Sequence, residues 1–214
     1  MRILLRLQIS AYIFVIVVSY FLGSIPAGYL AGKARGIDVR CQGSGNIGAT
    51  NVFRVLGRTA GIAVLAADAF KGFAAARWAP DLALHFFPAA GPGQEGLKLV
   101  AGAASILGHN FPCWLHFKGG KGIATSGGVV LAWAPAACLT ALGLWIVIFI
   151  LSRYVSLASI AAALILPFAV WYWNKSEAMT AVMAALSLLA IYKHKANLRR
   201  LLNGTENRFV RSRS

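Results

Sequence analysis

A long uncharged stretch near the beginning of the chain constrains its fold most. From Ala11 to Gly32 the sequence has no Asp, Glu, Lys or Arg. A helix of about 20 apolar residues is enough to cross the hydrocarbon core of a bilayer. The stretch is also longer than the apolar core of a cleaved secretory signal, which is the alternative interpretation. We therefore expect a first membrane-spanning helix here.

Further apolar segments predict an all-α integral membrane protein. The sequence is 58% hydrophobic, more than a soluble domain contains. Pro135 should divide the longest segment, because proline has no N–H to donate and clashes with the preceding turn. We then expect about seven transmembrane helices, some short or broken, in one membrane-embedded domain over residues 1–214. The further segments cover about residues 61–79, 97–107, 123–151, 155–173 and 178–192.

The distribution of positive charge predicts the orientation in the membrane. Cytoplasmic loops of membrane proteins carry an excess of Lys and Arg. Basic residues cluster over residues 33–58, at Lys118 and Lys121, and in a tail over about residues 193–214. These clusters lie on one side only if the chain turns back near Pro135. That topology places the N-terminus outside and the C-terminus in the cytoplasm.

The same charge bears on partners. Lys and Arg number 21 against six Asp and Glu, a surplus that suits nucleic acid, anionic lipids or anionic substrates. Because the basic clusters lie between apolar segments, we expect membrane lipids and anionic substrates, and no nucleic acid. Cys41, Cys113 and Cys138 have no paired spacing, so no disulfide is predicted. No cluster of Asp, Glu, His or Cys has metal-ligand spacing, so no metal site is predicted either.

A glycine-rich polar stretch, GSGNIGATNVFR, occupies residues 43–54. Glycine lets backbone N–H groups approach a ligand closely, and small polar side chains add neutral hydrogen-bonding groups. These side chains are Ser44, Asn46, Thr50 and Asn51. The combination favours a cradle for an anion.

A helix beginning near Ala49 would strengthen this interpretation. Asn51, Arg54 and Arg58 would then lie on one face. The N-terminus of such a helix suits a phosphate, because its N–H groups point outward and its dipole favours negative charge. The alternative is a loop that only reverses the chain, with arginines that contact lipid head groups.

A second cluster, GHNFPCWLHFKGGKG, occupies residues 108–122. Lys118 and Lys121 flank two glycines, so two ammonium groups and a flexible backbone could close on a second phosphate or an acyl phosphate. A strict P-loop is absent, which argues against nucleotide hydrolysis. His109 is a base, a ligand or a buried hydrogen-bonding residue.

Asp68 and Lys71 are charges inside an apolar segment. Such charges are costly in hydrocarbon, so they pair or face a polar cavity. Two interpretations remain open, an ion pair that holds two helices and a wall of the active site.

Two polar motifs lie in the last third of the chain. RYVSLAS, residues 153–159, places Ser156 and Ser159 on one helix face, where serines commonly bond neighbouring backbone. In KHKANLRRLLNGTENRF, residues 193–209, a basic tail on anionic lipid accounts for the charge. Binding to lipid does not account for its asparagine, glycine and glutamate.

In this order, GSGNIGATN, GHNFPCWLHFKGGKGIAT, YVSLAS and NLRRLLNGTENRF resemble the motifs of the bacterial PlsY family, the acyl-phosphate:glycerol-3-phosphate acyltransferases. The resemblance implies a seven-span enzyme of the cell inner membrane with its site toward the cytoplasm. It implies transfer of a fatty acyl group from acyl phosphate to the sn-1 hydroxyl of glycerol 3-phosphate, giving lysophosphatidic acid and phosphate for phospholipid synthesis. No cofactor is implied, and a monomer would suffice.

The resemblance also implies roles for individual residues. Arg54 and Lys121 would hold phosphate, and His194 and Asn197 would orient the glycerol backbone. With Ser44, these four form the expected catalytic set. The expected substrate-binding set is Asn46, Thr50, Asn51, His109, Lys118, Ser159, Glu206 and Arg208.

The mechanism follows from a missing motif. No His-x-x-x-x-Asp occurs, so the general-base dyad of coenzyme-A-dependent acyltransferases is absent. Acyl phosphate already has a good leaving group, and positive charge from Arg54 and Lys121 with close alignment would supply much of the rate. We hypothesise direct transfer with the proton passing to a substrate phosphate oxygen. His194 is the alternative base.

Two other classes of function use the same features. A membrane transporter of organic phosphates would need a continuous polar path to the outer face, and the outer turns are poor in such groups. A lipid-binding scaffold would need only the basic tail, and would leave the glycine motifs unexplained. Transport is the stronger alternative.

Overall fold

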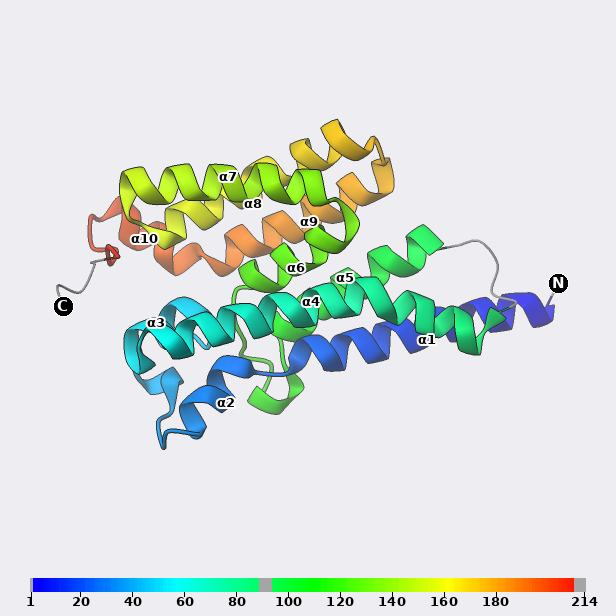
Figure 1. The fold of residues 1–214 in the computed structure, drawn as a ribbon, viewed down its shortest axis with the longest axis horizontal. Coiled ribbons are helices and arrows are strands. Elements are labelled where there is room, and N and C mark those ends of the chain that lie inside the picture. Colours follow the sequence, from blue (N-terminus) through cyan, green and yellow to red (C-terminus); the bar gives the residue numbers. More distant parts are fainter. Residues whose placement is uncertain (1, 89–93, 210–214) are drawn as a thin grey trace. The chain divides into compact units, whose positions relative to one another are not determined.

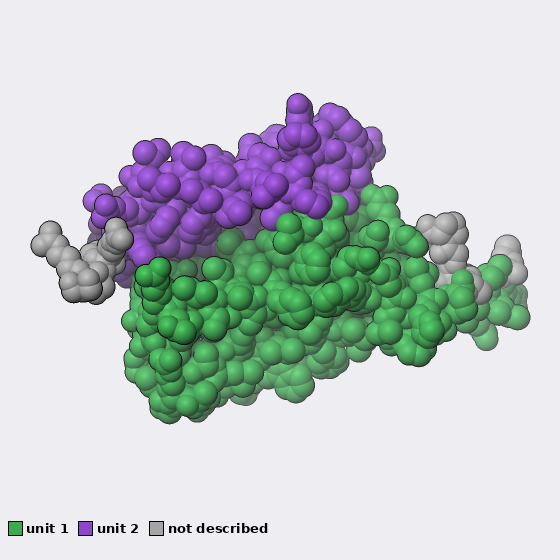
Figure 2. Space-filling model, in the orientation of Figure 1, with its two compact units in different colours: residues 1–133 green, residues 134–214 purple. Residues whose placement is uncertain are grey.

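The computed structural model describes residues 2–88 and 94–209, and within these ranges the regular structure is helical, with no strand. The chain divides into two compact units, residues 1–133 and residues 134–214 (Figure 2). The all-helical expectation is confirmed. The expectation of one domain over residues 1–214 stays a prediction.

Unit 1 contains both glycine-rich loops. Its helices are α1 (Arg2–Ser24), α2 (Ala27–Lys33), α3 (Ala49–Leu56), α4 (Arg58–Phe86), α5 (Gln94–Asn110) and α6 (Ile123–Trp133), with short 3-10 turns at Val39–Cys41 and Cys113–Leu115 (Figure 1). The predicted first spanning segment extends over α1 and α2, but it is interrupted at Ile25 and Pro26. Proline lacks the N–H that would continue the helix.

Small residues let the helices of unit 1 pack closely. Helix α1 packs against α4 and α5, and α4 packs against α6. At Gly128 of α6, an added Cβ would lie 1.8 Å from the carbonyl oxygen of Ala69 on α4. Close backbone contact at small residues is typical of helices in a membrane, where the lipid is as apolar as the side chains.

Unit 2 contains α7 (Pro135–Ser152), α8 (Val155–Asn174), α9 (Glu177–Lys193) and α10 (Lys195–Leu202). Helix α8 packs against α7 and α9, and the short α10 contacts both α8 and α9. The predicted break at Pro135 is confirmed, since α6 ends at Trp133 and α7 begins at Pro135. Helix α6 has only 11 residues, a length of about 17 Å.

Four helical segments of the described chain are long and apolar enough to cross a membrane. They are Arg2–Lys33, Arg58–Phe86, Pro135–Ser152 and Val155–Asn174. Helices α5 and α9, with 17 residues each, and the shorter α6 occupy the other predicted segments. The predicted segments are therefore helical, and their number as spans stays a prediction.

Candidate functional site

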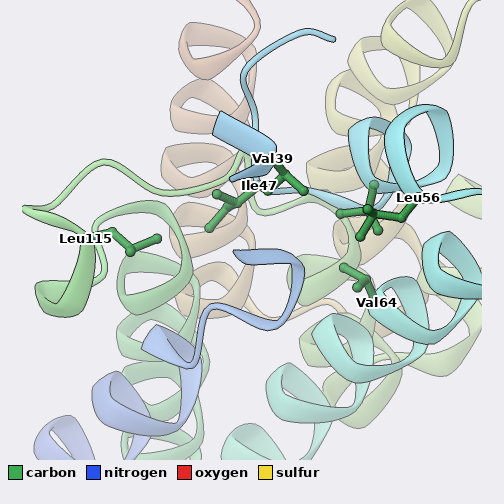
Figure 3. Packing of buried hydrophobic residues seen from close by; sticks show 6 residues of the cluster. Val39, Ile47, Leu56, Val64 and Leu115 are labelled. Atoms are coloured by element: carbon green, nitrogen blue, oxygen red, sulfur yellow. The ribbon is translucent and has the colours of Figure 1, made fainter. Parts of the chain in front are cut away.

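The two glycine-rich loops of unit 1 rest on one hydrophobic core. Residues from the first loop, from α3 and α4, and from the second loop all contribute buried side chains to it (Figure 3). Because they share this core, the two loops are held in the same part of unit 1. The core residues are Val39, Ile47, Val52, Leu56, Val64 and Leu115.

Asn51 holds the first loop in shape. Its side chain is 1% exposed, and its Oδ1 accepts a hydrogen bond from the backbone N–H of Ser44 at 2.7 Å. Its Nδ2 donates to the carbonyl oxygens of Val39 at 2.9 Å and Gln42 at 3.1 Å. Both amide hydrogens are thus used within the loop. The structure gives Asn51 a part in building the cradle, and its expected contact with substrate stays a prediction.

Glycine is required where the loop passes this amide. Gly43 has φ of 60°, in the left-handed region, and an added Cβ would lie 2.3 Å from Oδ1 of Asn51. Asn46 accepts a hydrogen bond through Oδ1 from the backbone N–H of Gly48 at 2.8 Å, just before α3. Ser44 is exposed and Thr50 is half-buried.

Helix α3 begins at Ala49, as predicted, but it is shorter than the face argument requires. It ends at Leu56, and Gly57 has φ of 88° before α4 begins at Arg58. The prediction that Arg58 shares a helix face with Asn51 and Arg54 is therefore wrong, because a left-handed residue separates them. Arg54 is exposed in the last turn of α3.

The second loop is tied to the end of α5. The backbone N–H of Gly119 donates to the carbonyl oxygen of Asn110 at 3.2 Å, and that of Gly120 donates to the carbonyl oxygen of His109 at 3.1 Å. An added Cβ on Gly120 would lie 2.0 Å from Nε2 of His109. The glycines thus allow close packing, where the sequence suggested flexibility. Lys118 is exposed and Lys121 is half-buried.

His109 joins a buried charged group. Nζ of Lys71 lies 2.8 Å from Oδ1 of Asp68, and Nδ1 of His109 lies 3.5 Å from the same oxygen. Lys71 also donates to the carbonyl oxygen of Ile25, where α1 is interrupted. The ion pair itself lies within α4, and through Ile25 and His109 it reaches α1 and α5.

Glu206 is the centre of a polar cluster in unit 2. Its Oε1 accepts hydrogen bonds from Oγ of Ser156 at 2.8 Å and Nδ2 of Asn197 at 2.7 Å, and its Oε2 accepts one from Nε of Arg200 at 2.7 Å. Burial raises the pKa of Glu206, but the hydrogen bonds from Asn197, Arg200 and Ser156 outweigh burial and hold that pKa below its usual value. The cluster fastens the tail to α8 and α10.

Sequence reasoning missed the parts that Ser156 and Arg200 play in this cluster. Arg200 and Glu206 are six positions apart, a spacing that follows no helical or strand period, because a turn lies between them. The spacing of Ser156 alone predicts a hydrogen bond to neighbouring backbone. Only the presence of a single acid in a basic tail pointed to a partner.

The remaining predicted residues of unit 2 have defined partners. His194 is buried between α9 and α10, and its Nδ1 lies 2.8 Å from the carbonyl oxygen of Ala190, which requires a hydrogen on Nδ1. Oγ of Ser159 donates to the carbonyl oxygen of Val155 at 2.8 Å. Nε of Arg208 donates to the hydroxyl of Tyr154 at 3.0 Å.

Each unit therefore gathers a part of the predicted set. Unit 1 brings its two polar loops onto one core, with Ser44, Asn46, Thr50, Asn51, Arg54, His109, Lys118 and Lys121. Unit 2 gathers the polar residues around α8, α10 and the tail, with Ser159, His194, Asn197, Glu206 and Arg208. Over the ranges that the structure describes, no group of three or more His, Cys, Asp and Glu could hold a metal ion.

Known proteins resemble this chain over nearly its whole length. A family model described as glycerol-3-phosphate acyltransferase matches residues 13–204. The glycerol-3-phosphate acyltransferase of Fusobacterium nucleatum is 42% identical over 200 residues, covering 93% of this chain and 98% of that protein. The protein of the same description from Desulforudis audaxviator is 45% identical over 200 residues, covering 93% of this chain and 96% of that protein.

The fold has solved relatives as well. Two crystal structures of PlsY (YgiH), an integral membrane glycerol 3-phosphate acyltransferase, are 38% identical in sequence to this chain. The glycerol 3-phosphate form gives a TM-score of 0.82 and covers 93% of this chain and 96% of that chain. The lysophosphatidic acid form gives a TM-score of 0.80 and covers 93% of this chain and 95% of that chain.

Proposed function

The chain belongs to the glycerol-3-phosphate acyltransferase family, and from this we propose that it transfers a fatty acyl group from acyl phosphate to the sn-1 hydroxyl of glycerol 3-phosphate. The products are lysophosphatidic acid and inorganic phosphate, at the start of phospholipid synthesis. The observation that carries this proposal is the family match over residues 13–204, which includes both glycine-rich loops and most of the polar residues of unit 2.

Acyl phosphate is the donor that this sequence suits. The His-x-x-x-x-Asp base motif is absent, so the chain lacks the dyad that activates a hydroxyl toward a thioester. In the proposed step, the sn-1 oxygen bonds to the acyl carbonyl carbon and the bond from that carbon to the phosphate oxygen breaks. The hydroxyl proton passes to a phosphate oxygen of a substrate, so the chain itself remains unmodified.

Positive charge is the main contribution of the protein to this step. Arg54, exposed at the end of α3, and Lys121, directly after the second glycine loop, bind the phosphate groups of the substrates. Charge placed in advance where negative charge develops lowers the barrier without reorganisation. His194 and Asn197 orient the glycerol backbone, and Ser44, whose backbone N–H is bound by Asn51, contributes its hydroxyl to the cradle.

We also propose that α1, α4, α5, α6, α7, α8 and α9 each cross the cell inner membrane, with the N-terminus outside and the site toward the cytoplasm. Residues 1–214 then act as one acyltransferase domain. The charge pattern supports this, because the basic loop after α2, the loop before α6 and the tail would all face the cytoplasm.

The test is to supply purified protein with glycerol 3-phosphate and either palmitoyl phosphate or palmitoyl-coenzyme A, and to measure phosphate release and lysophosphatidic acid. We expect product from acyl phosphate only. Lys121→Ala should lower kcat/KM about a hundredfold. Lys175→Ala removes an exposed lysine at the turn between α8 and α9, outside the proposed site, and should leave it unchanged.

Three results would contradict the proposal. Equal rates with the thioester would overturn the donor assignment. An acyl group trapped on Ser44 would replace direct transfer by a covalent mechanism. No product from either donor, in protein that still binds glycerol 3-phosphate, would favour transport over catalysis.

A further inference from the structure

A buried charged group lies beside the second glycine loop, and two of its members, Asp68 and Lys71, take no part in the proposed chemistry. Asp68, Lys71 and His109 are 2%, 5% and 4% exposed. Oδ1 of Asp68 is the shared point, 2.8 Å from Nζ of Lys71 and 3.5 Å from Nδ1 of His109. Charges in such surroundings are costly, so their presence calls for a role.

The imidazole of His109 connects this group to the loop. Its Nδ1 edge faces Asp68, and its Nε2 edge faces the backbone of Gly120, where an added Cβ would lie 2.0 Å away. The carbonyl oxygen of His109 also accepts the hydrogen bond from the N–H of Gly120. Movement of His109 would therefore move Gly120, and Lys121 is the next residue.

Lys71 anchors the other side of the group. Its Nζ donates to the carbonyl oxygen of Ile25 at 2.7 Å, at the interruption between α1 and α2. Asp68 is thereby fixed from α1 as well as from α4. Nδ1 of His109 lies 3.5 Å from this carboxylate, longer than an ordinary hydrogen bond, so Asp68 orients the ring through its charge. An apolar side chain would remove that orienting charge.

We propose that Asp68 is a positioning residue for acyl transfer, which fixes His109 and through it the loop that places Lys121. This inference rests on the proposed function, because the consequence of placing Lys121 is seen in the use of acyl phosphate. A purely structural role for Asp68 would change the amount of folded protein and would leave KM unchanged.

The main test uses Asp68→Asn combined with Lys71→Met, which removes both charges and leaves no lone charge buried. In folded full-length protein, we expect KM for palmitoyl phosphate to rise about tenfold. In a Lys121→Ala background, the same pair of changes should add no further rise, because the effect acts through Lys121.

The matched control is Arg77→Gln combined with Asp81→Asn. This pair is also an ion pair on α4, but its side chains are 50% and 54% exposed. We expect its KM to stay at the wild-type value. A tenfold rise in the control would show that any loss of charge on α4 disturbs the enzyme, and would overturn the inference.

A second variant keeps the inference testable if the double variant at Asp68 and Lys71 folds poorly. His109→Gln leaves Asp68 and Lys71 paired, and we expect the same rise in KM, again absent in the Lys121→Ala background. Unchanged KM in either variant, or a rise that persists without Lys121, overturns the inference. An inactive wild-type protein would overturn the proposed function itself, whereas active wild type with unaffected variants would overturn only the role of Asp68.

Discussion

Nδ2 of Asn197 donates a hydrogen bond to Oε1 of Glu206 at 2.7 Å, which joins α10 to the tail that follows it. The same carboxylate binds Ser156 of α8 and Arg200 of α10. One acid thus satisfies side chains that come from distant parts of unit 2. The arrangement explains why a basic tail retains an acidic residue.

Replacing this acid should weaken unit 2. Glu206→Gln keeps an oxygen for Ser156 and Asn197, but its amide would meet the N–H of Arg200. Because hydrogen bonds to charged groups are lost, we expect unfolding to become easier by about 1–3 kcal/mol. Thermal unfolding in detergent measures this. Glu177→Gln, at an exposed position in α9, is the control and should change little.

The contribution of Glu206 to the stability of the folded chain should decrease as the pH is lowered. Its pKa is lower in the folded chain than its ordinary value of 4.5. A group whose pKa is lowered by folding stabilises the folded state at pH values above its unfolded-state pKa. This stabilisation is lost as the pH falls through its folded-state pKa. The gap in melting temperature between wild type and Glu206→Gln should therefore be full at pH 7 and shrink below pH 4.5. A constant gap would contradict this.

Gly120 should not tolerate a side chain. In Gly120→Ala the new Cβ would overlap Nε2 of His109, so the loop or the ring must shift. Overpacking of this kind costs about 1–3 kcal/mol, and we expect acyl transfer to fall with it. The control is Gly127→Ala in α6, where an added Cβ meets nothing within 4 Å. Equal activity of both variants would show that the loop has room.

Loss of the Asn51 amide should loosen the first loop. Asn51→Ala removes one acceptor and two donated hydrogen bonds, and leaves buried partners unsatisfied at a cost of about 1–3 kcal/mol. Hydrogen exchange should accelerate at residues 39–48, and KM for glycerol 3-phosphate should rise. Asn174→Ala, at the exposed end of α8, should change neither. Normal exchange in Asn51→Ala would refute the assigned role.

The proposed topology can be tested with cysteine labelling. Cys41 is exposed, and in a Cys113→Ser, Cys138→Ser background it is the one target. An impermeant maleimide should label it in inverted vesicles and not in intact spheroplasts. Lys175→Cys in a cysteine-free background should behave in the opposite way, since it lies at the turn between α8 and α9. The reverse pattern would invert the topology.

The sequence predicted helix positions well, because apolar runs and turn residues act locally. The helix start at Ala49 and the break at Pro135 are both confirmed. Proline did not mark a helix break at every position, however. Pro26 lies in the interruption between α1 and α2, while Pro80 lies inside α4. Neighbouring groups in a membrane protein can satisfy the freed carbonyl, and a single sequence does not show them.

Side-chain partners were harder to predict than helices. Asn51 and Glu206 belong to the expected substrate-binding set, which stays a prediction, and the structure adds hydrogen bonds from both to parts of their own unit. Their partners are backbone groups and turn residues. The orientation of these partners depends on the conformation of the loops, which the periodicity of the sequence does not show. The left-handed Gly57 likewise separated Arg58 from α3, although the spacing alone fitted one helix.

The position of Glu206 along the chain also affects synthesis. Helix α8 is made about fifty residues before its partner carboxylate, because Ser156 and Glu206 are 50 positions apart. During translation, Ser156 and Asn197 therefore lack this partner until the tail has been made, and Ser156 can meanwhile bond a carbonyl of its own helix. A chain that ended before Glu206 would therefore leave the hydrogen bonds of Ser156 and Asn197 to this carboxylate unmade.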